Sequence, residues 1–332
     1  MNRGLPISAR ALPATLALAA AATMLGACGA DEEPDASGES PVKAPPAGEF
    51  PAPAGTLDDL LADVGTSNDI VASQSGGVFE PGDERFGFGL FDVGGDQITD
   101  ATAAIYAARG TDGKTLGPFP ARIETLETEP EFVAQTTAED DAKVVYVANV
   151  PFDKPGEWNL AAVVKRPDGT VATRLAATVI VDDYKDIPDV GEPAPEVHTP
   201  TLSQVGGDVE AIDTRVPPSS MHGDDLAEVL RSEPVVLLFA TPSLCQSRVC
   251  GPVVDVAEQV KAEHGDEAAF IHQEIYIDNI PDPENLRPQV EAYGLPTEPW
   301  LFVIDEEGDV STRIEGAFSA AELEDALEPL VG

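Results

Sequence analysis

The periodicity of apolar residues changes near Pro188, and this change constrains the fold more than any other feature of the sequence. Between residues 56 and 185, apolar residues alternate with polar ones or form short runs separated by turn residues, which is typical of antiparallel strands. Between residues 189 and 332, short apolar runs alternate with stretches of helical periodicity. A chain of 332 residues is long enough for two domains. The sequence therefore predicts an all-β domain over 56–185 and an α/β domain over 189–332.

The all-β region is expected to contain short strands joined by turn signals such as Glu80-Pro81-Gly82-Asp83. The predicted strands cover 70–74, 85–93, 101–109, 132–136, 143–150, 157–165 and 171–181. Strands at this spacing predict a β-sandwich of the immunoglobulin type. The stretch 145–158 resembles one hairpin of bacterial extracytoplasmic immunoglobulin-like domains. The region has neither Cys nor His, which argues against a soft-metal site or a disulfide within it. We expect a spacer or a partner-docking module.

The α/β region is expected to alternate helices with strands. The predicted helices cover 223–231, 247–263, 284–292 and 319–330, and the predicted strands cover 234–240, 268–275, 299–305 and 310–314. His264-Gly265 is a helix stop, and Ser319 with Glu322 three residues later predicts a capping box.

Two of the three cysteines, Cys245 and Cys250, lie where a predicted strand meets a predicted helix. On one continuous α-helix, residues five apart have Cα atoms about 8.6 Å apart, whereas a disulfide needs less than about 7 Å. We therefore expect Cys245 in the loop before the helix and Cys250 near the first turn, where Gly251-Pro252 is tolerated. There the helix dipole and the charge of Arg248 would stabilise a thiolate. A passive disulfide staple is the alternative interpretation.

Three motifs carry a resemblance to a known family: 190–197 (Val-Gly-Glu-Pro-Ala-Pro-Glu-Val), 250–252 (Cys-Gly-Pro) and 293–305 (Tyr-Gly-Leu-Pro-Thr-Glu-Pro-Trp-Leu-Phe-Val-Ile-Asp). They resemble the opening segment of redoxins, the first three residues of the thioredoxin C-G-P-C motif, and the thioredoxin segment in which a proline opens a strand. The α/β region is thus similar to the thioredoxin superfamily, in particular to its TlpA-type oxidoreductases. It departs from the motif because Val253 stands where the second Cys would be, so C-x2-C has become C-x4-C.

The resemblance implies that Pro299 is a cis-proline beside the dithiol and that the reaction is thiol-disulfide exchange with protein or small-molecule partners. No bound cofactor is expected, and the direction of exchange is left open. Glu298 stands where thioredoxins carry Thr, Val or Ile, and its carboxylate would accept a proton or raise the pKa of the thiols. The buried Asp of thioredoxins is missing; Glu274 is either its substitute or a solvated strand residue. His272 is either structural or part of a metal site or proton relay.

Two other functions remain open on this fold, besides a scaffold without catalysis. The C-x4-C spacing and Thr241-Pro242 resemble the atypical two-Cys bacterioferritin-comigratory peroxiredoxins, although Thr241 lies four residues before Cys245 rather than three. Sco-type proteins bind copper(I) with two thiolates and a His. Those proteins use C-x3-C and a His nearer the C-terminus, whereas no His follows His272 here.

The first 27 residues resemble a lipoprotein signal peptide. A stretch with two arginines precedes an apolar run over 12–24 that is too short to span a membrane. Leu25-Gly26-Ala27-Cys28 resembles a lipobox, in which Cys28 becomes the lipidated first residue. Residues 28–55 are rich in Pro, Ala, Gly and acidic residues and are expected to form a disordered tether. Together these features predict a lipid-anchored protein on the extracytoplasmic face of a cell membrane.

The charge of the chain excludes one class of partner. Acidic residues outnumber basic ones 60 to 19, which gives a net charge of −41. No basic block is present to neutralise phosphates, so nucleic-acid binding is excluded. The same charge repels anionic lipid head groups, so an acyl group rather than the peptide would have to hold the membrane.

Overall fold

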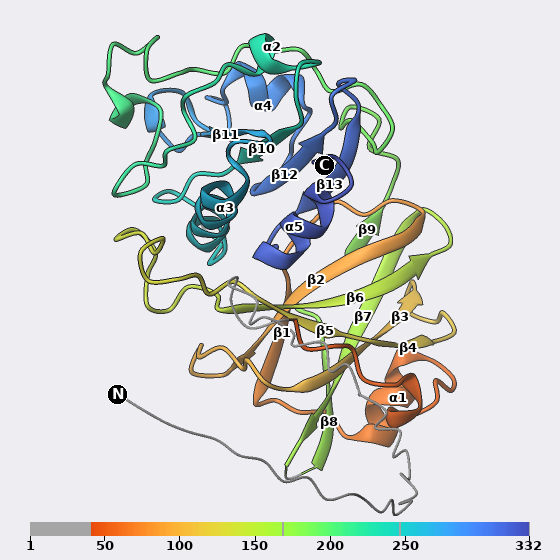
Figure 1. Cartoon of the computed structure of the whole chain (residues 1–332). Helices are drawn as coiled ribbons and strands as arrows, with labels where there is room; N and C mark the ends of the chain where they lie inside the picture. The colour runs from red at the N-terminus through yellow and green to blue at the C-terminus, as the bar shows by residue number, and fades with distance from the viewer. Residues whose placement is uncertain (1–40, 168, 246, 332) are drawn as a thin grey trace, which may run out of the picture. The chain divides into compact units, whose positions relative to one another are not determined.

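The computed structural model describes residues 41–331 except 168 and 246 (Figure 1). The predicted signal peptide and Cys28 lie outside the described residues. Among the residues described, strands β1–β9 form two antiparallel sheets and strands β10–β13 form a separate mixed sheet. None of the helices seen here has both the length and the apolar character that crossing a bilayer requires.

The first two sheets enclose one apolar core. One sheet has the order β1-β2-β6-β5, with bounds Ile70–Gln74, Gly82–Asp92, Val144–Phe152 and Arg122–Thr125. The other has the order β4-β3-β7-β8, with bounds Leu116–Pro120, Thr102–Arg109, Gly156–Arg166 and Gly169–Arg174, and β9 (Val179–Val181) also pairs with β7. Because side chains alternate along a strand, every second residue enters the shared core, as do Phe86 and Phe88 of β2 and Ile105 of β3. The arrangement is a two-sheet sandwich, and its immunoglobulin type stays a prediction.

Part of the predicted tether is ordered. The backbone of Val42 exchanges two hydrogen bonds of 3.0 Å with Ile123 of β5. Phe50, 6% exposed, shares a second apolar cluster with α1 (Leu57–Val64) and with Tyr106 of β3. The prediction of disorder is therefore wrong from residue 41 onward. Phe50 packs on the apolar surface of α1 and Tyr106, and the backbone of Val42 pairs with the edge strand β5.

Four strand predictions differ from the structure in this half, one of them the predicted strand 171–181, which is divided into β8 and β9. The strand β4 was not predicted; it contains Pro118 and Pro120 and lies at the edge of its sheet, where proline is tolerated. The strand β5 was also not predicted. Residues 132–136, predicted as a strand, form a loop, in which the N–H of Ala134 donates to Asp255 rather than to a neighbouring strand.

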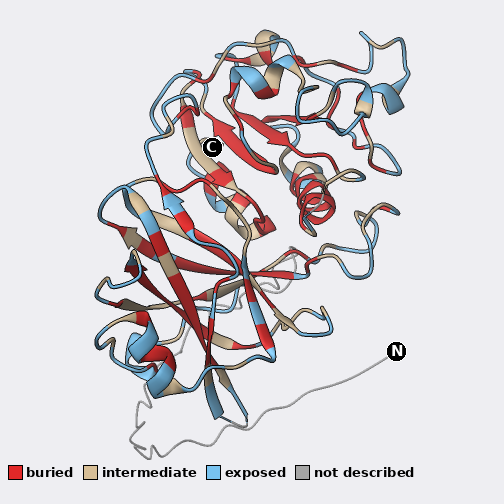
Figure 2. Ribbon diagram, turned by 180° about the vertical axis from the view of Figure 1, so that it is seen from behind, coloured by how far each residue is buried: buried red, intermediate tan, exposed pale blue. Residues whose placement is uncertain are grey.

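The second half is built on a four-stranded mixed sheet in the order β11-β10-β12-β13. The central strand β10 (Val235–Phe239) is parallel to β11 (Ala269–Gln273) and antiparallel to β12 (Trp300–Ile304), which pairs with β13 (Val310–Glu315) in antiparallel fashion. Every residue of β10 is buried, as expected for an apolar strand that is covered on both faces. The strands β10, β11 and β12 are buried at every residue, and Figure 2 shows the centre of this half in red.

Helices cover both faces of this sheet. On one face, α3 (Cys250–His264) and α5 (Ala320–Leu327) share a core with β10 and β12. On the other face, α2 (Leu226–Val229) and α4 (Pro288–Ala292) pack against the same strands. The predicted capping box at Ser319 and Glu322 is confirmed. The helices α2, α4 and α5 are shorter than predicted. Among the described residues, 3-10 turns occur at Val209–Ala211 and Ile277–Asn279 in this half and at Ala47–Glu49 before the sandwich. This strand order with helices on both faces is the thioredoxin-like arrangement that the sequence predicted.

Buried polar contacts join the sandwich to the thioredoxin-like half, and all described residues belong to one compact unit. The carboxylate of Glu322 on α5 accepts hydrogen bonds from Arg85 at 2.7 Å and from Arg122 at 2.6 Å. Burial alone would raise the pKa of Glu322, but the two guanidinium groups lower it below its ordinary value. Glu315 of β13 accepts hydrogen bonds from the N–H groups of Gly77 and Val78. These contacts fix the sandwich to the thioredoxin-like half, which is not expected of a flexible spacer.

Candidate active site

Cys245 and Cys250 are joined by a disulfide at the junction of β10 and α3. Cys245 lies in the turn after β10, where its N–H donates to the carbonyl of Thr241 over 3.0 Å. Cys250 is the first residue of α3. Their Cα atoms are 6.2 Å apart, less than the distance of about 8.6 Å along a continuous helix. The loop placement inferred from helix geometry is therefore confirmed.

The two sulfur atoms differ in exposure. Cys250 is 1% exposed and belongs to the core that α3 shares with β10, whereas Cys245 is only partly buried at the edge of that core. The hydroxyl of Ser247 lies 3.0 Å from Cys245 Sγ and 3.7 Å from Cys250 Sγ. A substrate would therefore reach the sulfur of Cys245 more readily than that of Cys250. The Ser247 hydroxyl beside these sulfurs was not predicted from the sequence.

Glu298 and Pro299 lie opposite the disulfide. The Glu298–Pro299 peptide bond is cis, as the resemblance implied. The carboxylate of Glu298 accepts a hydrogen bond of 2.9 Å from the N–H of Thr241, and one of its oxygens and the two sulfur atoms all lie within 4.8 Å of one another. Burial raises the pKa of Glu298 to about 7. The site therefore has a carboxyl group that changes its protonation near neutral pH beside the disulfide.

Glu274 directly follows β11 and is 1% exposed. Its carboxylate accepts hydrogen bonds from the N–H of Thr214 at 2.6 Å and from the Thr214 hydroxyl at 2.8 Å. Burial raises the pKa of Glu274, and its negative charge adds to the rise at Glu298. The interpretation of Glu274 as a solvated strand residue is therefore wrong; it is a buried carboxyl group that interacts electrostatically with Glu298.

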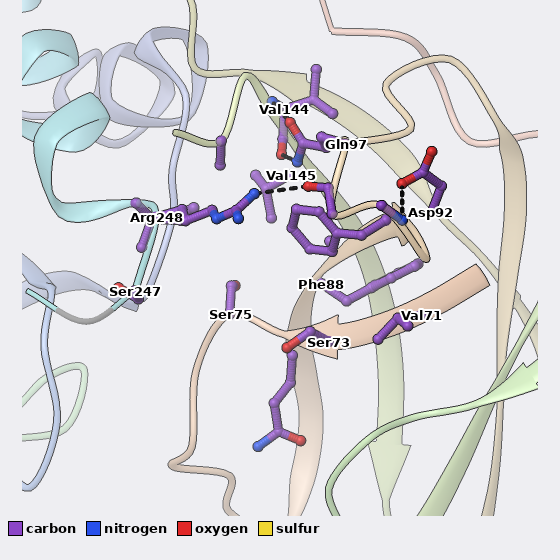
Figure 3. Close-up of a pocket in the computed structure, with 18 of the residues that line it drawn as sticks. Val71, Ser73, Ser75, Phe88, Asp92, Gln97, Val144, Val145, Ser247 and Arg248 are labelled. Carbon is purple, nitrogen blue, oxygen red and sulfur yellow. Dashed lines mark hydrogen bonds between the residues drawn. The ribbon is translucent and has the colours of Figure 1, made fainter. Parts of the chain in front are cut away.

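Arg248 points toward the sandwich. Its guanidinium donates to the carbonyl of Gly95 at 2.9 Å, lies 3.5 Å from the carboxylate of Asp140, and sits 5.7 Å from the centroid of the Phe91 ring (Figure 3). These three groups hold the guanidinium on the sandwich side, and the role of Arg248 as a positive charge beside a thiolate stays a prediction.

A mainly apolar pocket of about 620 Å³ separates the sandwich from the segment that carries the disulfide (Figure 3). Phe88, Phe91 and Val145 line it from the sandwich, and Ser247 and Arg248 line it from the turn before α3. Ser247 thus belongs both to the wall of this pocket and to the surroundings of the two sulfurs.

A loop of the sandwich over residues 126–143 covers the first turns of α3. Asp255 of α3, 2% exposed, accepts a hydrogen bond of 2.7 Å from the Thr137 hydroxyl and lies 2.9 Å from the guanidinium of Arg215. Burial raises the pKa of Asp255. At Gly251 a Cβ atom would lie 3.1 Å from Thr137 Oγ1, so the loop lies directly against this turn. The sequence did not predict this loop, because its apolar run over 132–136 indicated a strand.

Comparisons with known proteins give a partial likeness. No protein-family model matches the chain, and no curated protein matches it. One similar solved structure is described as a thiol:disulfide interchange protein DsbE of Chlorobium tepidum; it is 18% identical over 44% of this chain and 99% of that one, with a TM-score of 0.31. Another is a thiol:disulfide interchange protein of the thioredoxin family from Chlorobium tepidum TLS, 18% identical over 42% of this chain and 96% of that one, with a TM-score of 0.29.

Proposed function

We propose that the protein is a thiol-disulfide oxidoreductase in which Cys245 attacks and Cys250 resolves. The observation that carries this proposal is the Cys245–Cys250 disulfide before α3, beside Glu298 and the cis Pro299. Two thiols that close a disulfide in place transfer two electrons without any cofactor.

In the reducing direction, the thiolate of Cys245 attacks one sulfur of a substrate disulfide. The substrate S–S bond breaks, its other sulfur leaves as a thiolate that takes up a proton, and Cys245 is held in a mixed disulfide. Cys250 then attacks Cys245 Sγ, which closes the Cys245–Cys250 bond and releases the second substrate thiol. The protein dithiol is oxidised and the substrate disulfide is reduced by two electrons; the oxidising direction is the reverse.

The assignment of roles follows from burial and position. An in-line attack needs an accessible sulfur, and Cys245 is the more exposed of the two. Cys250 begins α3, where the free N–H groups and the helix dipole favour a thiolate. Glu298, with a pKa of about 7, accepts the proton of Cys250 when that thiol attacks. The hydroxyl of Ser247 donates a hydrogen bond to whichever sulfur carries negative charge.

The alternative activities have less support. Thr241 is fully buried, its N–H donates to Glu298 and its hydroxyl accepts the N–H of Ile275 at 3.2 Å, so the hydroxyl is not turned toward a peroxide. For copper(I), the donor that joins the two sulfurs is the oxygen of Glu298 rather than an imidazole, and soft copper(I) prefers sulfur and nitrogen donors.

Turnover of a disulfide substrate tests the proposal. The purified chain without residues 1–27 is assayed for reduction of a protein disulfide with dithiothreitol as the electron source. We expect turnover, and we expect background rates for Cys245→Ser and for Cys250→Ser. Absence of turnover together with a Cys245–Cys250 bond that resists dithiothreitol would contradict the proposal. Consumption of peroxide or stoichiometric binding of copper(I) by the same sample would favour one of the alternatives.

We also propose that a lipid on Cys28 anchors the chain to the extracytoplasmic face of a cell membrane. The lipobox-like sequence Leu25-Gly26-Ala27-Cys28 after a short apolar run supports this. In cells, Cys28→Ala is expected to move the protein from the membrane fraction to the soluble fraction. Unchanged membrane association of that variant would contradict the lipid anchor.

A further inference from the structure

One cluster of donor atoms has no role in the proposed redox reaction. The side chains of Asp213, Ser219 and His222 meet His272 of β11. Between Val181 and Val235, where the chain is fully described, regular structure is limited to one 3-10 turn and α2. Irregular segments this long are uncommon inside compact domains. The cluster ties the middle of this segment to the sheet.

The distances between the donor atoms suit a metal ion. Asp213 Oδ2 lies 2.9 Å from His222 Nε2 and 3.6 Å from His272 Nδ1. Ser219 Oγ lies 3.2 Å from His222 Nε2 and 3.1 Å from His272 Nδ1. In a tetrahedral zinc site with bonds of about 2.0–2.1 Å, neighbouring donors are about 3.3 Å apart. The donor atoms of Asp213, His222 and His272 all lie within 4.8 Å of one another, so a closer approach of the two imidazoles would let them surround one ion.

The surroundings orient these donors. The Nε2–H of His272 donates to the carbonyl of Ala240 at 3.0 Å, which leaves Nδ1 of that ring facing the other donors. The second oxygen of Asp213 accepts the N–H of Arg215 at 2.7 Å. Such outer hydrogen bonds fix the tautomer and orientation of metal-binding side chains. In His222 the nitrogen that faces Asp213 and Ser219 is Nε2, so an ion would bind there; Nδ1 of that ring is buried without a hydrogen-bond partner within the described chain.

Burial sets these two histidines apart from the other histidines of the chain. His222 is 4% exposed and His272 is 2% exposed, with Asp213 at 3%, whereas the side chains of His198 and His264 are more exposed and each pairs with one carboxylate. Two imidazoles around a buried carboxylate form a donor set typical of divalent first-row ions. Because burying a carboxylate is costly, a bound cation would offset that cost.

We propose that Asp213, His222 and His272 bind one divalent first-row transition ion, with Zn²⁺ the best match and Ser219 as the fourth neighbour. The ion would be structural, because all four residues are buried. It would fix the irregular segment to β11. Thr214, next to Asp213, bonds to Glu274 and accepts the N–H of Ser243 in the turn that carries Cys245. The ion would thus also restrict the motion of the backbone next to the turn that carries Cys245.

Metal titration in a chain that lacks the two thiols tests this proposal. The double variant Cys245→Ser/Cys250→Ser excludes binding at the sulfurs and at Glu298. It is unfolded in chelator, refolded with or without Zn²⁺ or Co²⁺, and freed of loose ions. We expect one bound ion per chain and a rise of the unfolding midpoint by on the order of 5 °C at an ion concentration about 100 times Kd.

Three further substitutions in the same background locate the ion. Asp213→Asn keeps the hydrogen-bonding shape and His222→Gln keeps a polar side chain, and both are expected to weaken binding by about 100-fold or more. His264→Gln, at a histidine outside the cluster, is the matched control and should bind as before. A folded double variant that retains no ion, or binding that survives Asp213→Asn, would overturn the proposal. Disulfide turnover is measured on the chain with both cysteines. The proposed redox function and the proposed metal site can therefore be refuted separately.

Discussion

The sandwich and the thioredoxin-like half differ in what they bury. The sandwich encloses apolar side chains between its sheets, and Glu124 is its only fully buried charged residue among those described. The thioredoxin-like half contains Cys245, Cys250 and all four histidines, and it buries several ionisable groups: Asp213, Arg215, His222, Asp225, Asp255, His272 and Glu274. Buried charges cost free energy of folding unless they are paired. Their concentration in one half therefore marks where the chemistry is expected.

The two halves are nevertheless coupled, because the sandwich supplies charged partners to the other half. Glu322→Ala removes the shared partner of Arg85 and Arg122 and half of the capping box of α5. We expect a loss of about 3 kcal/mol in the free energy of unfolding, since two guanidinium groups lose their carboxylate. Denaturant unfolding measures it, with the exposed Asp325→Ala on the same helix as control. Equal stability of both variants would show that the halves are energetically independent.

The pH dependence of stability sharpens this result. The folded pKa of Glu322 lies below its ordinary value of 4.5. Between the folded pKa and 4.5 the unfolded chain binds more protons, so stability rises with pH in that range. The contribution is complete above pH 4.5 and is lost as the pH falls through the folded pKa. The difference between wild type and Glu322→Ala should therefore shrink in acid.

Glu298→Gln tests the electrostatics of the thioredoxin-like half. If Glu298 accepts the proton of Cys250, the variant should exchange disulfides on the order of 100-fold more slowly. The wild-type rate should rise through pH 7, where Glu298 ionises, and the variant should lack this step. A pH profile that is the same in both proteins would remove Glu298 from the mechanism.

Stability offers a second readout for the same residue. The pKa of Glu298 is raised in the folded state from 4.5 to about 7. The folded chain therefore binds more protons between these values, and its stability falls as pH rises across that range. The stability of the Glu298→Gln variant should therefore vary less with pH than that of the wild type. At pH 8 the variant should be the more stable of the two, as measured by thermal unfolding.

Thr137→Val probes the loop over residues 126–143. The substitution keeps the side-chain shape but removes the 2.7 Å hydrogen bond to the buried carboxyl of Asp255. We expect a cost of about 1.5 kcal/mol and faster alkylation of reduced Cys250 in a Cys245→Ser background, because the loop covers the turn that begins with Cys250. Glu139→Gln, an exposed position of the same loop, serves as control. Unchanged alkylation would mean that the loop does not shield Cys250.

Ser247→Ala should have the smallest effect. The hydroxyl lies within hydrogen-bonding distance of both sulfurs, so its loss should slow exchange a few-fold, equivalent to about 1 kcal/mol. Stopped-flow measurement of reduction by dithiothreitol at fixed pH reports this rate. A rate equal to that of the wild type would assign the hydroxyl to packing alone.

The sequence predicted the thioredoxin-like half better than the sandwich. The apolar run of β10 and the capping box of α5 are local signals, and both are confirmed. The strand β4 was missed because its edge position, which tolerates Pro118, depends on pairing with β3. The direction of Arg248 and the approach of Thr137 to Asp255 depend on contacts between residues far apart in the chain. No local pattern encodes those contacts.

Trapping of mixed disulfides tests the central claim most directly, namely that Cys245 is the accessible half of a working redox pair. The chain carrying Cys250→Ser and, separately, the chain carrying Cys245→Ser are reduced, exposed to a protein disulfide and examined by non-reducing mass spectrometry. We predict stable adducts on Cys245 in the first variant and few or none in the second. Adducts confined to Cys250, or absent from both variants, would contradict the account.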